Sequence, residues 1–193
     1  EDAVFGAHSA TEVFILSQQQ RQAFIKYYPG CEDRLHEVPP GISPDRQVEA
    51  VDENLRKELR QEFDIEENEK LILQVGSGFK VKGVDRSLKA IVALPDKIRY
   101  TVRYLLVGQD KAAGFQKLAN KLGVADQVTI LPGRDDIPRF LAGADLLLHP
   151  AYAESAGYVL LEATIAGLPV LTTASCGYSS HIEQAQSGEV CNN

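Results

Sequence analysis

From Leu71 onward the chain alternates short apolar runs with longer amphipathic stretches, and this alternation is the strongest constraint on its fold. Uninterrupted apolar runs are typical of strands buried on both faces of a parallel sheet. We expect strands at 71–75, 104–107, 128–131, 146–148, 169–172 and 189–191. We expect helices between them at 84–92, 115–122, 137–142, 159–166 and 179–186. The order of these elements predicts an α/β fold with a Rossmann-like, doubly wound parallel sheet.

The first 44 residues form a smaller unit, in which the pattern predicts a strand, a helix and a strand at 13–16, 18–28 and 35–38. A linker is expected near 42–47, and the polar segment 45–69, helical from 53 to 63, leads into the main domain. We therefore divide the chain into 1–44 and 45–193, with the compact part of the second unit beginning near residue 50. Because the sequence contains no methionine and stops just after an expected strand, we expect a piece of a longer protein, truncated at its C-terminus.

The balance of charge limits the partners of this chain. Its 27 acidic and 20 basic residues give a net charge of −7, which argues against a nucleic-acid surface and against direct contact with an anionic membrane. The three cysteines are odd in number and lack the spacing of a metal site, which favours reduced thiols in the cytosol. The acidic residues form no metal-binding pattern either, so no metal is expected.

A glycine-rich turn, Gly76-Ser77-Gly78, follows the first long strand, where ligands of open α/β sheets bind. The dinucleotide fingerprint fails because Val81 stands where its third glycine is required. A P-loop fails because Val84-Asp85 replaces its lysine and hydroxyl residue. Lys80 and Lys82 beside a helix N-terminus would form a modest anion site. A tight turn with two solvated lysines explains these residues equally well.

The loop 150–157 gives a stronger signal, because it contains Glu154 and opens a helix that carries Glu162. If the segment were helical throughout, the two acids would lie ~12 Å apart. That distance suits two acceptors for an elongated polyol better than a pair flanking one glycosidic bond, which lies ~5–9.5 Å apart. The N–H groups near Gly157, Tyr158 and Val159 could hold an anion between them. Glu162 stands in an apolar run, and a buried acid needs a partner, which favours function over a solvated side chain.

Other candidate groups carry less information. His149 ends an expected strand before this loop and could line a site, but a packing role is at least as consistent, so we assign it no catalytic role. Asp135-Asp136 at an expected helix start fits N-terminal charge better than a metal pair. Ser155 and Ser175 lack the glycine-flanked turn of a serine nucleophile.

Several motifs together resemble a known family. Two glutamates separated by seven residues span 154–162, Ala166-Gly167-Leu168-Pro169-Val170 follows, and Pro39-Pro40-Gly41-Ile42 precedes the main domain. These motifs are similar to those of the retaining GT-B glycosyltransferases of glycosyltransferase family 4. The segments most similar to its lipopolysaccharide core glucosyltransferases are 74–77, 82–87, 107–111, 146–152, 168–173 and 176–178. The resemblance spans essentially the whole chain and implies the C-terminal, donor-binding domain of a GT-B fold.

The resemblance also implies an activity. The expected enzyme transfers glucose from a UDP-glucose donor, with retention and without a metal or other cofactor, to an inner-core heptose of lipopolysaccharide at the cytosolic face of the bacterial inner membrane. By match, Glu154 would act as the catalytic residue that binds the glucose hydroxyls, Glu162 would bind the ribose hydroxyls, and Lys82 would meet the diphosphate. The full donor-binding set implied by the match is Lys82, Gly157, Tyr158, Val159, Glu162, Gly76 and Ser77.

The chain departs from the family in two respects. Val81 stands where the lipopolysaccharide core glucosyltransferase that this chain resembles carries an arginine, which weakens the phosphate clamp unless Lys80 substitutes. The acceptor-binding N-terminal domain is absent except for 1–44, as is the C-terminal helix that crosses back to it. We therefore expect this chain to bind donor without transferring sugar, with acceptor and membrane contacts made by the missing domain. Another UDP-hexose or UDP-hexosamine donor, or a non-catalytic nucleotide-sugar-binding module, remain open alternatives. A dehydrogenase is disfavoured because its glycine fingerprint fails.

Overall fold

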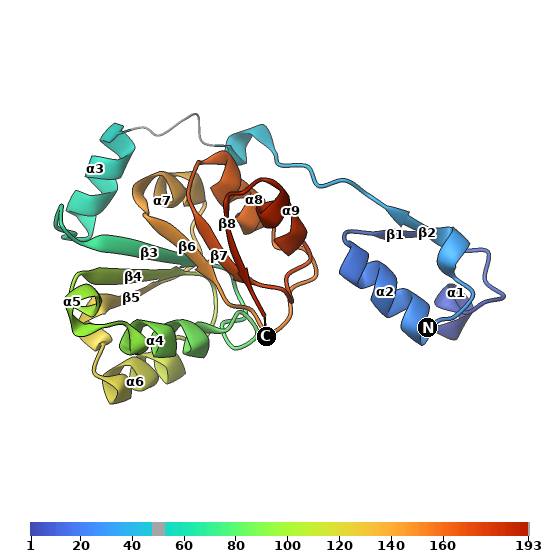
Figure 1. Cartoon of the computed structure of the whole chain (residues 1–193), viewed down its shortest axis with the longest axis horizontal. Coiled ribbons are helices and arrows are strands. Elements are labelled where there is room, and N and C mark those ends of the chain that lie inside the picture. Colours follow the sequence, from blue (N-terminus) through green and yellow to red (C-terminus); the bar gives the residue numbers. More distant parts are fainter. Residues whose placement is uncertain (48–52, 193) are drawn as a thin grey trace.

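The main body of the protein is a six-stranded, all-parallel sheet, seen in a computed structural model that describes residues 1–47 and 53–192 (Figure 1). Its strand order is β5-β4-β3-β6-β7-β8. The strands are β3 (Lys70–Val75), β4 (Val102–Val107), β5 (Val128–Leu131), β6 (Leu146–His149), β7 (Val170–Thr173) and β8 (Gly188–Cys191). The chain runs outward from β3 to one edge, then returns to pair β6 against β3 and continues to the other edge. This reversal confirms the expected doubly wound sheet and creates a switch point between β3 and β6.

Helices cover both faces of the sheet (Figure 1). One face packs against α4 (Val84–Ala93) and α6 (Ala113–Leu122). The other face packs against α3 (Glu53–Glu62), α7 (Ile137–Gly143), α8 (Tyr158–Ile165) and α9 (Ser179–Gln184). The uninterrupted apolar strands follow from this arrangement, because successive side chains point to opposite faces and each face has its own core. Leu71 and Leu73 enter the core under α3, α7 and α8, whereas Ile72 enters the core under α4 and α6.

Gln74 is the polar exception within this buried strand, and both its side-chain oxygen and its side-chain nitrogen form hydrogen bonds. Its side-chain carbonyl accepts hydrogen bonds from Ser87 Oγ and from the Tyr104 hydroxyl, each at 2.6 Å. Its amide donates to the backbone carbonyl of Lys82 at 2.8 Å. Burial raises the pKa of Tyr104, which keeps its phenol protonated as a donor. The buried amide therefore ties the carboxyl end of β3 to the turn that precedes α4.

Asp145, directly before β6, anchors α3 to the sheet. Its carboxylate accepts the Leu71 N–H at 2.7 Å and lies 2.8 Å from an Arg56 guanidinium nitrogen and 3.3 Å from one of Arg60. Burial alone would raise the pKa of Asp145, but the Leu71 N–H and the two guanidinium groups outweigh it and hold the pKa below its usual value. The charged segment before β3 is thus fastened through ion pairs as well as through its apolar face.

The smaller N-terminal unit contains α1 (Asp2–Phe5), β1 (Val13–Ile15), α2 (Gln18–Tyr27) and β2 (Leu35–Glu37). β1 and β2 pair in parallel, which confirms the expected strand–helix–strand order. Ser17 caps α2 by accepting the N–H of Gln20. The side chain of Gln19 donates to the carbonyl of Ala174 at 2.6 Å, which joins this unit to the main body.

The expected elements of the main body are all present, with ends shifted by no more than two residues. Gly123 adopts a left-handed conformation with φ +72° and ends α6, as its position predicts. Two short α-helices were not expected: α1 and α5 (Asp96–Arg99), each a single turn with no buried residue and hence no apolar periodicity. The expected start of the compact domain near residue 50 lies outside the described residues.

Candidate functional site

A cavity of about 380 Å³ lies at the switch point, beyond the carboxyl ends of β3 and β6. Its wall is formed by Arg46, Val75, Gly76, Lys82, His149, Glu154, Ser155, Ala156, Gly157, Tyr158, Val159 and Glu162. Hollows of about 480 and 540 Å³ occur next to β7 and β8 and along α3, but their walls contain none of these residues. Because ligands of open α/β sheets bind at the carboxyl ends of the strands beside the switch point, the cavity at β3 and β6 is the candidate site.

Seven of the eight residues that the sequence singled out line this one cavity, although they come from two separate stretches of chain, 76–82 and 154–162. They are Gly76, Lys82, Glu154, Gly157, Tyr158, Val159 and Glu162. Ser77 is the exception: it is exposed, and its hydroxyl accepts the N–H of Gln109 at 3.1 Å. Lys80 is likewise exposed and does not line the cavity.

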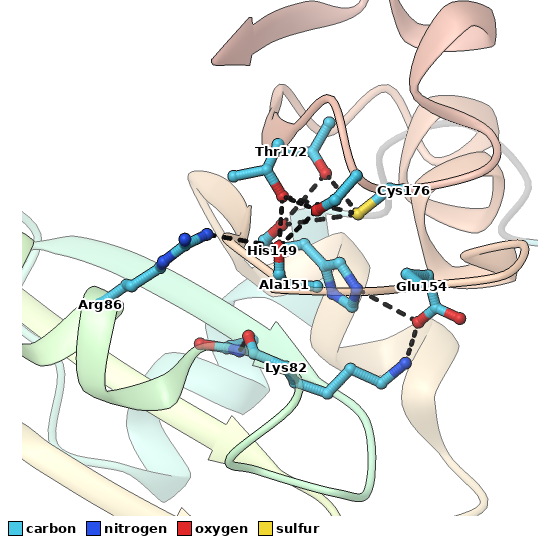
Figure 2. Close-up of polar contacts among 10 residues, drawn as sticks. Lys82, Arg86, His149, Ala151, Glu154, Thr172 and Cys176 are labelled. Carbon is cyan, nitrogen blue, oxygen red and sulfur yellow. Dashed lines mark hydrogen bonds and ion pairs between the residues drawn. The ribbon is translucent and has the colours of Figure 1, made fainter. Parts of the chain in front are cut away.

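Lys82 reaches the cavity because of the turn before α4. Gly83 has a φ of +70°, and a Cβ on it would lie 2.1 Å from the carbonyl oxygen of Pro150, so only glycine fits there. The Lys82 side chain is mostly buried and its ammonium group contacts a carboxylate oxygen of Glu154 (Figure 2). Burial lowers the pKa of Lys82 from its usual value, an effect partly opposed by the nearby Cys176. A cation is thus held at the wall of the cavity, paired with an acid.

The segment that carries Glu154 is fixed by backbone hydrogen bonds to the loop after β7. The Glu154 N–H donates to Ser175, the Glu154 carbonyl accepts from Gly177 at 2.9 Å, and the Ala156 carbonyl accepts from Tyr178 at 2.8 Å. A Cβ on Gly177 would lie 2.1 Å from the Ser155 carbonyl oxygen, so the two loops approach as closely as glycine allows. We call these two loops, 154–157 and 175–178, the paired loops.

Threonine hydroxyls fix the first part of the same connection (Figure 2). Thr172 donates to the carbonyl of His149 at 3.1 Å, and Thr173 donates to the carbonyl of Ala151 at 2.7 Å. The Arg86 guanidinium approaches the same Ala151 carbonyl from α4, at 3.4 Å. The backbone between β6 and Glu154 is therefore held from both sides of the switch point.

Gly157 is the N-cap residue directly before α8 and has a left-handed conformation with φ +95°. Gly157, Tyr158 and Val159 all line the cavity, so the beginning of this helix forms part of the wall. The first N–H groups of a helix have no partner within the helix, and the helix dipole places partial positive charge there. This end of α8 and Lys82 together suit an anionic group.

Glu162 lies one turn further along α8 and is buried, as its apolar surroundings predict. The partner that a buried acid needs is supplied by Arg46, whose Nε and Nη2 lie 3.0 and 3.2 Å from the two carboxylate oxygens. The separation of about 12 Å expected for Glu154 and Glu162 rested on a continuous helix. That assumption is wrong, because α8 begins at Tyr158 and Glu154 lies in a loop with its own bridge to Cys176.

His149, which the sequence left without a role, lies in the wall of the cavity and is almost fully buried, with 1% of its surface exposed. Neither ring nitrogen makes a hydrogen bond within the described part of the chain. The carboxylate of Glu154 faces the ring, with Oε2 at 3.5 Å from Nε2. Burial, with a further contribution from Lys82, lowers the pKa of His149 to about 4, so the ring is neutral at pH 7.

Arg46 is the site residue that sequence reasoning missed. It lies in a single turn of 3-10 helix, Pro44–Arg46, within the expected linker, and its partner is 116 positions away.

Within residues 1–47 and 53–192, no group of three or more His, Cys, Asp and Glu side chains is placed to hold a metal ion. Across those same ranges, no helix is long and apolar enough to cross a membrane.

A doubly wound parallel sheet, with a cavity at its switch point whose wall carries charged side chains, defines a Rossmann-like ligand-binding domain. Residues 55–193 match the family of glycosyl transferases group 1, and the chain belongs to this family. The lipopolysaccharide glucosyltransferase WaaG of Escherichia coli K12 is 47% identical over 190 residues, which make up 98% of this chain and 51% of WaaG. The D-inositol 3-phosphate glycosyltransferase of Mycobacterium marinum is 28% identical, over 93% of this chain and 38% of its own length.

Solved structures agree with this assignment. The crystal structure of WaaG, a glycosyltransferase involved in lipopolysaccharide biosynthesis, matches with a TM-score of 0.93 over 100% of this chain and 52% of WaaG. The chain therefore has the fold of the matching half of WaaG, a GT-B glycosyltransferase structure. Anabaena HepE in complex with UDP and glucose matches with a TM-score of 0.84 at 23% identity, over 96% of this chain and 50% of HepE, and shows the same fold. The chain spans about half the length of WaaG and less of the mycobacterial relative.

Proposed function

We propose that this chain is the donor-binding half of a lipopolysaccharide core glucosyltransferase, which transfers glucose from UDP-glucose to an inner-core heptose with retention of configuration. One observation carries the proposal: residues from two separate stretches, 76–82 and 154–162, which the family resemblance implies to bind a nucleotide sugar, line a single cavity at the switch point. The 47% identity to a lipopolysaccharide glucosyltransferase supports the choice of acceptor class.

The chemistry of the wall fits three of the four parts of a UDP-sugar: the ribose, the diphosphate and the hexose. Lys82 and the start of α8 would bind the diphosphate, because both present positive charge. Glu162 would accept hydrogen bonds from the two ribose hydroxyls, one on each carboxylate oxygen. Both oxygens can face a single partner, because both accept from Arg46 in this structure. Glu154 would accept from the hydroxyls of the glucose. The two carboxylates would thus bind the two neutral sugars, ribose and glucose, and the positive groups would bind the diphosphate between them.

The same groups would assist the transfer. Breaking the bond between glucose and UDP leaves negative charge on the β-phosphate, and preorganised positive groups lower the barrier by stabilising that charge. Lys82 and the N-terminus of α8 would supply this stabilisation, so the proposed reaction requires no metal. The N-terminal half of such an enzyme would bind the acceptor. It would also make the contact with the cytosolic face of the membrane.

Thermal unfolding with different nucleotides tests the donor site. UDP and UDP-glucose at a hundred times their dissociation constants are expected to stabilise the chain by about 2.7 kcal/mol, while GDP and NAD leave it unchanged. Glu162→Gln, which keeps the shape of the side chain, should lose most of this shift, and Glu183→Gln on the exposed part of α9 should keep it. Stabilisation by GDP or NAD equal to that by UDP would contradict a uridine site.

A second comparison tests the sugar. UDP-glucose should bind more tightly than UDP-galactose and UDP-N-acetylglucosamine if glucose is the donor. Tighter binding of either alternative would move the proposal to a transferase that uses that donor.

A further inference from the structure

The side chains of Lys82, Glu154 and His149 form a cluster at one side of the cavity (Figure 2). Lys82 and His149 approach the same oxygen of Glu154, Oε2, but only Lys82 lies at bonding distance. The imidazole, at 3.5 Å, has no hydrogen bond on either nitrogen within the described residues. A buried polar group without a partner is costly, and here the ring belongs to the wall of a ligand cavity.

The chemistry of the cluster selects the group that would satisfy it. Nε2 faces a carboxylate, which favours the neutral tautomer with its proton on Nε2. A ligand atom here must accept from Nε2 and donate to Glu154. A hydroxyl group does both, whereas a phosphate oxygen only accepts and would be repelled by the carboxylate.

We propose that His149 is a specificity-determining residue, which binds one hydroxyl group of the donor hexose together with Glu154. The inference rests on the proposed function, because it requires a nucleotide sugar in this cavity. Nε2–H donates to the hydroxyl oxygen and the hydroxyl proton is donated to Glu154, with Lys82 holding the carboxylate in place. A donor that lacks this hydroxyl leaves two buried groups unpaired, and sites of this kind reject such analogues strongly.

The test compares the affinity of UDP with that of UDP-glucose, measured by isothermal titration calorimetry on the 193-residue chain. In the unsubstituted chain, UDP-glucose should bind more tightly than UDP, and one of the UDP-deoxyglucoses should lose that advantage. His149→Phe should leave the affinity for UDP nearly unchanged and weaken UDP-glucose by about 10- to 100-fold. It should also bind UDP-glucose and the critical deoxy analogue equally, which a loss of packing alone would not produce.

Two further variants complete the design. His149→Gln, which retains an N–H donor at a similar reach, should recover part of the preference for UDP-glucose. His8→Gln, at an exposed position in the N-terminal unit, should behave as the unsubstituted chain. Equal weakening of UDP and UDP-glucose by His149→Phe, or an unchanged preference, would overturn the assignment of His149. Failure of the unsubstituted chain to bind any uridine nucleotide would instead overturn the proposed function.

Discussion

Arg46 engages both carboxylate oxygens of Glu162, at 3.0 and 3.2 Å. The arginine belongs to the segment that leaves the N-terminal unit, and the glutamate belongs to α8 in the main body. Both line the candidate site. A ribose diol bound to Glu162 would use the same two oxygens, so it would compete with the linker for one carboxylate.

Arg46→Ala should therefore bind UDP more tightly, because the competing guanidinium is gone. Without UDP the variant should be less stable by about 1–2 kcal/mol, since Glu162 is left buried and unpaired but Arg46 is itself partly exposed. Calorimetric titration with UDP and urea unfolding measure the two effects. Lys26→Ala, on the exposed side of α2, is the matched control. Weaker binding of UDP to Arg46→Ala would mean that Arg46 orients Glu162 instead of competing for it.

Lys82→Met should lower the affinity for UDP by roughly 10- to 100-fold, which is the usual effect of losing a hydrogen bond to a charged group. The dependence of UDP affinity on salt concentration should also become shallower. Lys80→Met should change neither quantity, because Lys80 is exposed and outside the wall of the cavity. Titrations at two salt concentrations check both variants. An equal loss in the two would assign Lys80 to the phosphate site after all.

The buried neutral ring of His149 should make stability depend on pH. Its pKa is about 4 in the folded chain against 6.5 for an ordinary histidine, so the unfolded state binds the extra proton first as pH falls. Stability from this group is complete above pH 6.5 and is lost as pH falls toward 4, by roughly 3 kcal/mol in total. Urea unfolding between pH 7 and 4 should show a shallower loss in His149→Gln, whereas His8→Gln keeps the original slope. Parallel curves for all three proteins would rule out a buried neutral His149.

Gly83→Ala should destabilise the chain by more than about 2 kcal/mol, because the new Cβ meets the Pro150 carbonyl and the backbone has positive φ. Gly114→Ala in α6, where a Cβ meets nothing within 4 Å, should instead stabilise by about 0.5–1 kcal/mol. Thermal unfolding distinguishes the two. A neutral Gly83→Ala would show that the Pro150 carbonyl can move away without cost.

The parts of this protein that the sequence predicts are those governed by local pattern. The strand at 128–131 was expected at the bounds it has, because its apolar run ends at Pro132-Gly133. The burial of Glu162 was also predictable from its apolar neighbours. Its partner was not, since the pairing with Arg46 depends on how a polar linker folds back over 116 positions.

The direction of a side chain at the end of a strand is equally hard to predict from the sequence. His149 ends β6, and nothing in its neighbours indicates whether its ring packs in the core or enters the cavity beside Glu154. Ser77 was predicted to line the site because of its place in the chain, and the structure directs its side chain elsewhere. It stands next to Gly76, which lines the cavity, yet its own side chain bonds to Gln109.

The paired loops have a consequence for how a ligand is received. Because hydrogen bonds between 154–157 and 175–178 already hold the backbone around Glu154, binding would not have to order that loop. Ordering flexible segments is one of the main entropic costs of association, and preorganisation removes it. The conformational entropy of this wall is lost when the protein folds, so contacts made to it contribute more fully to affinity.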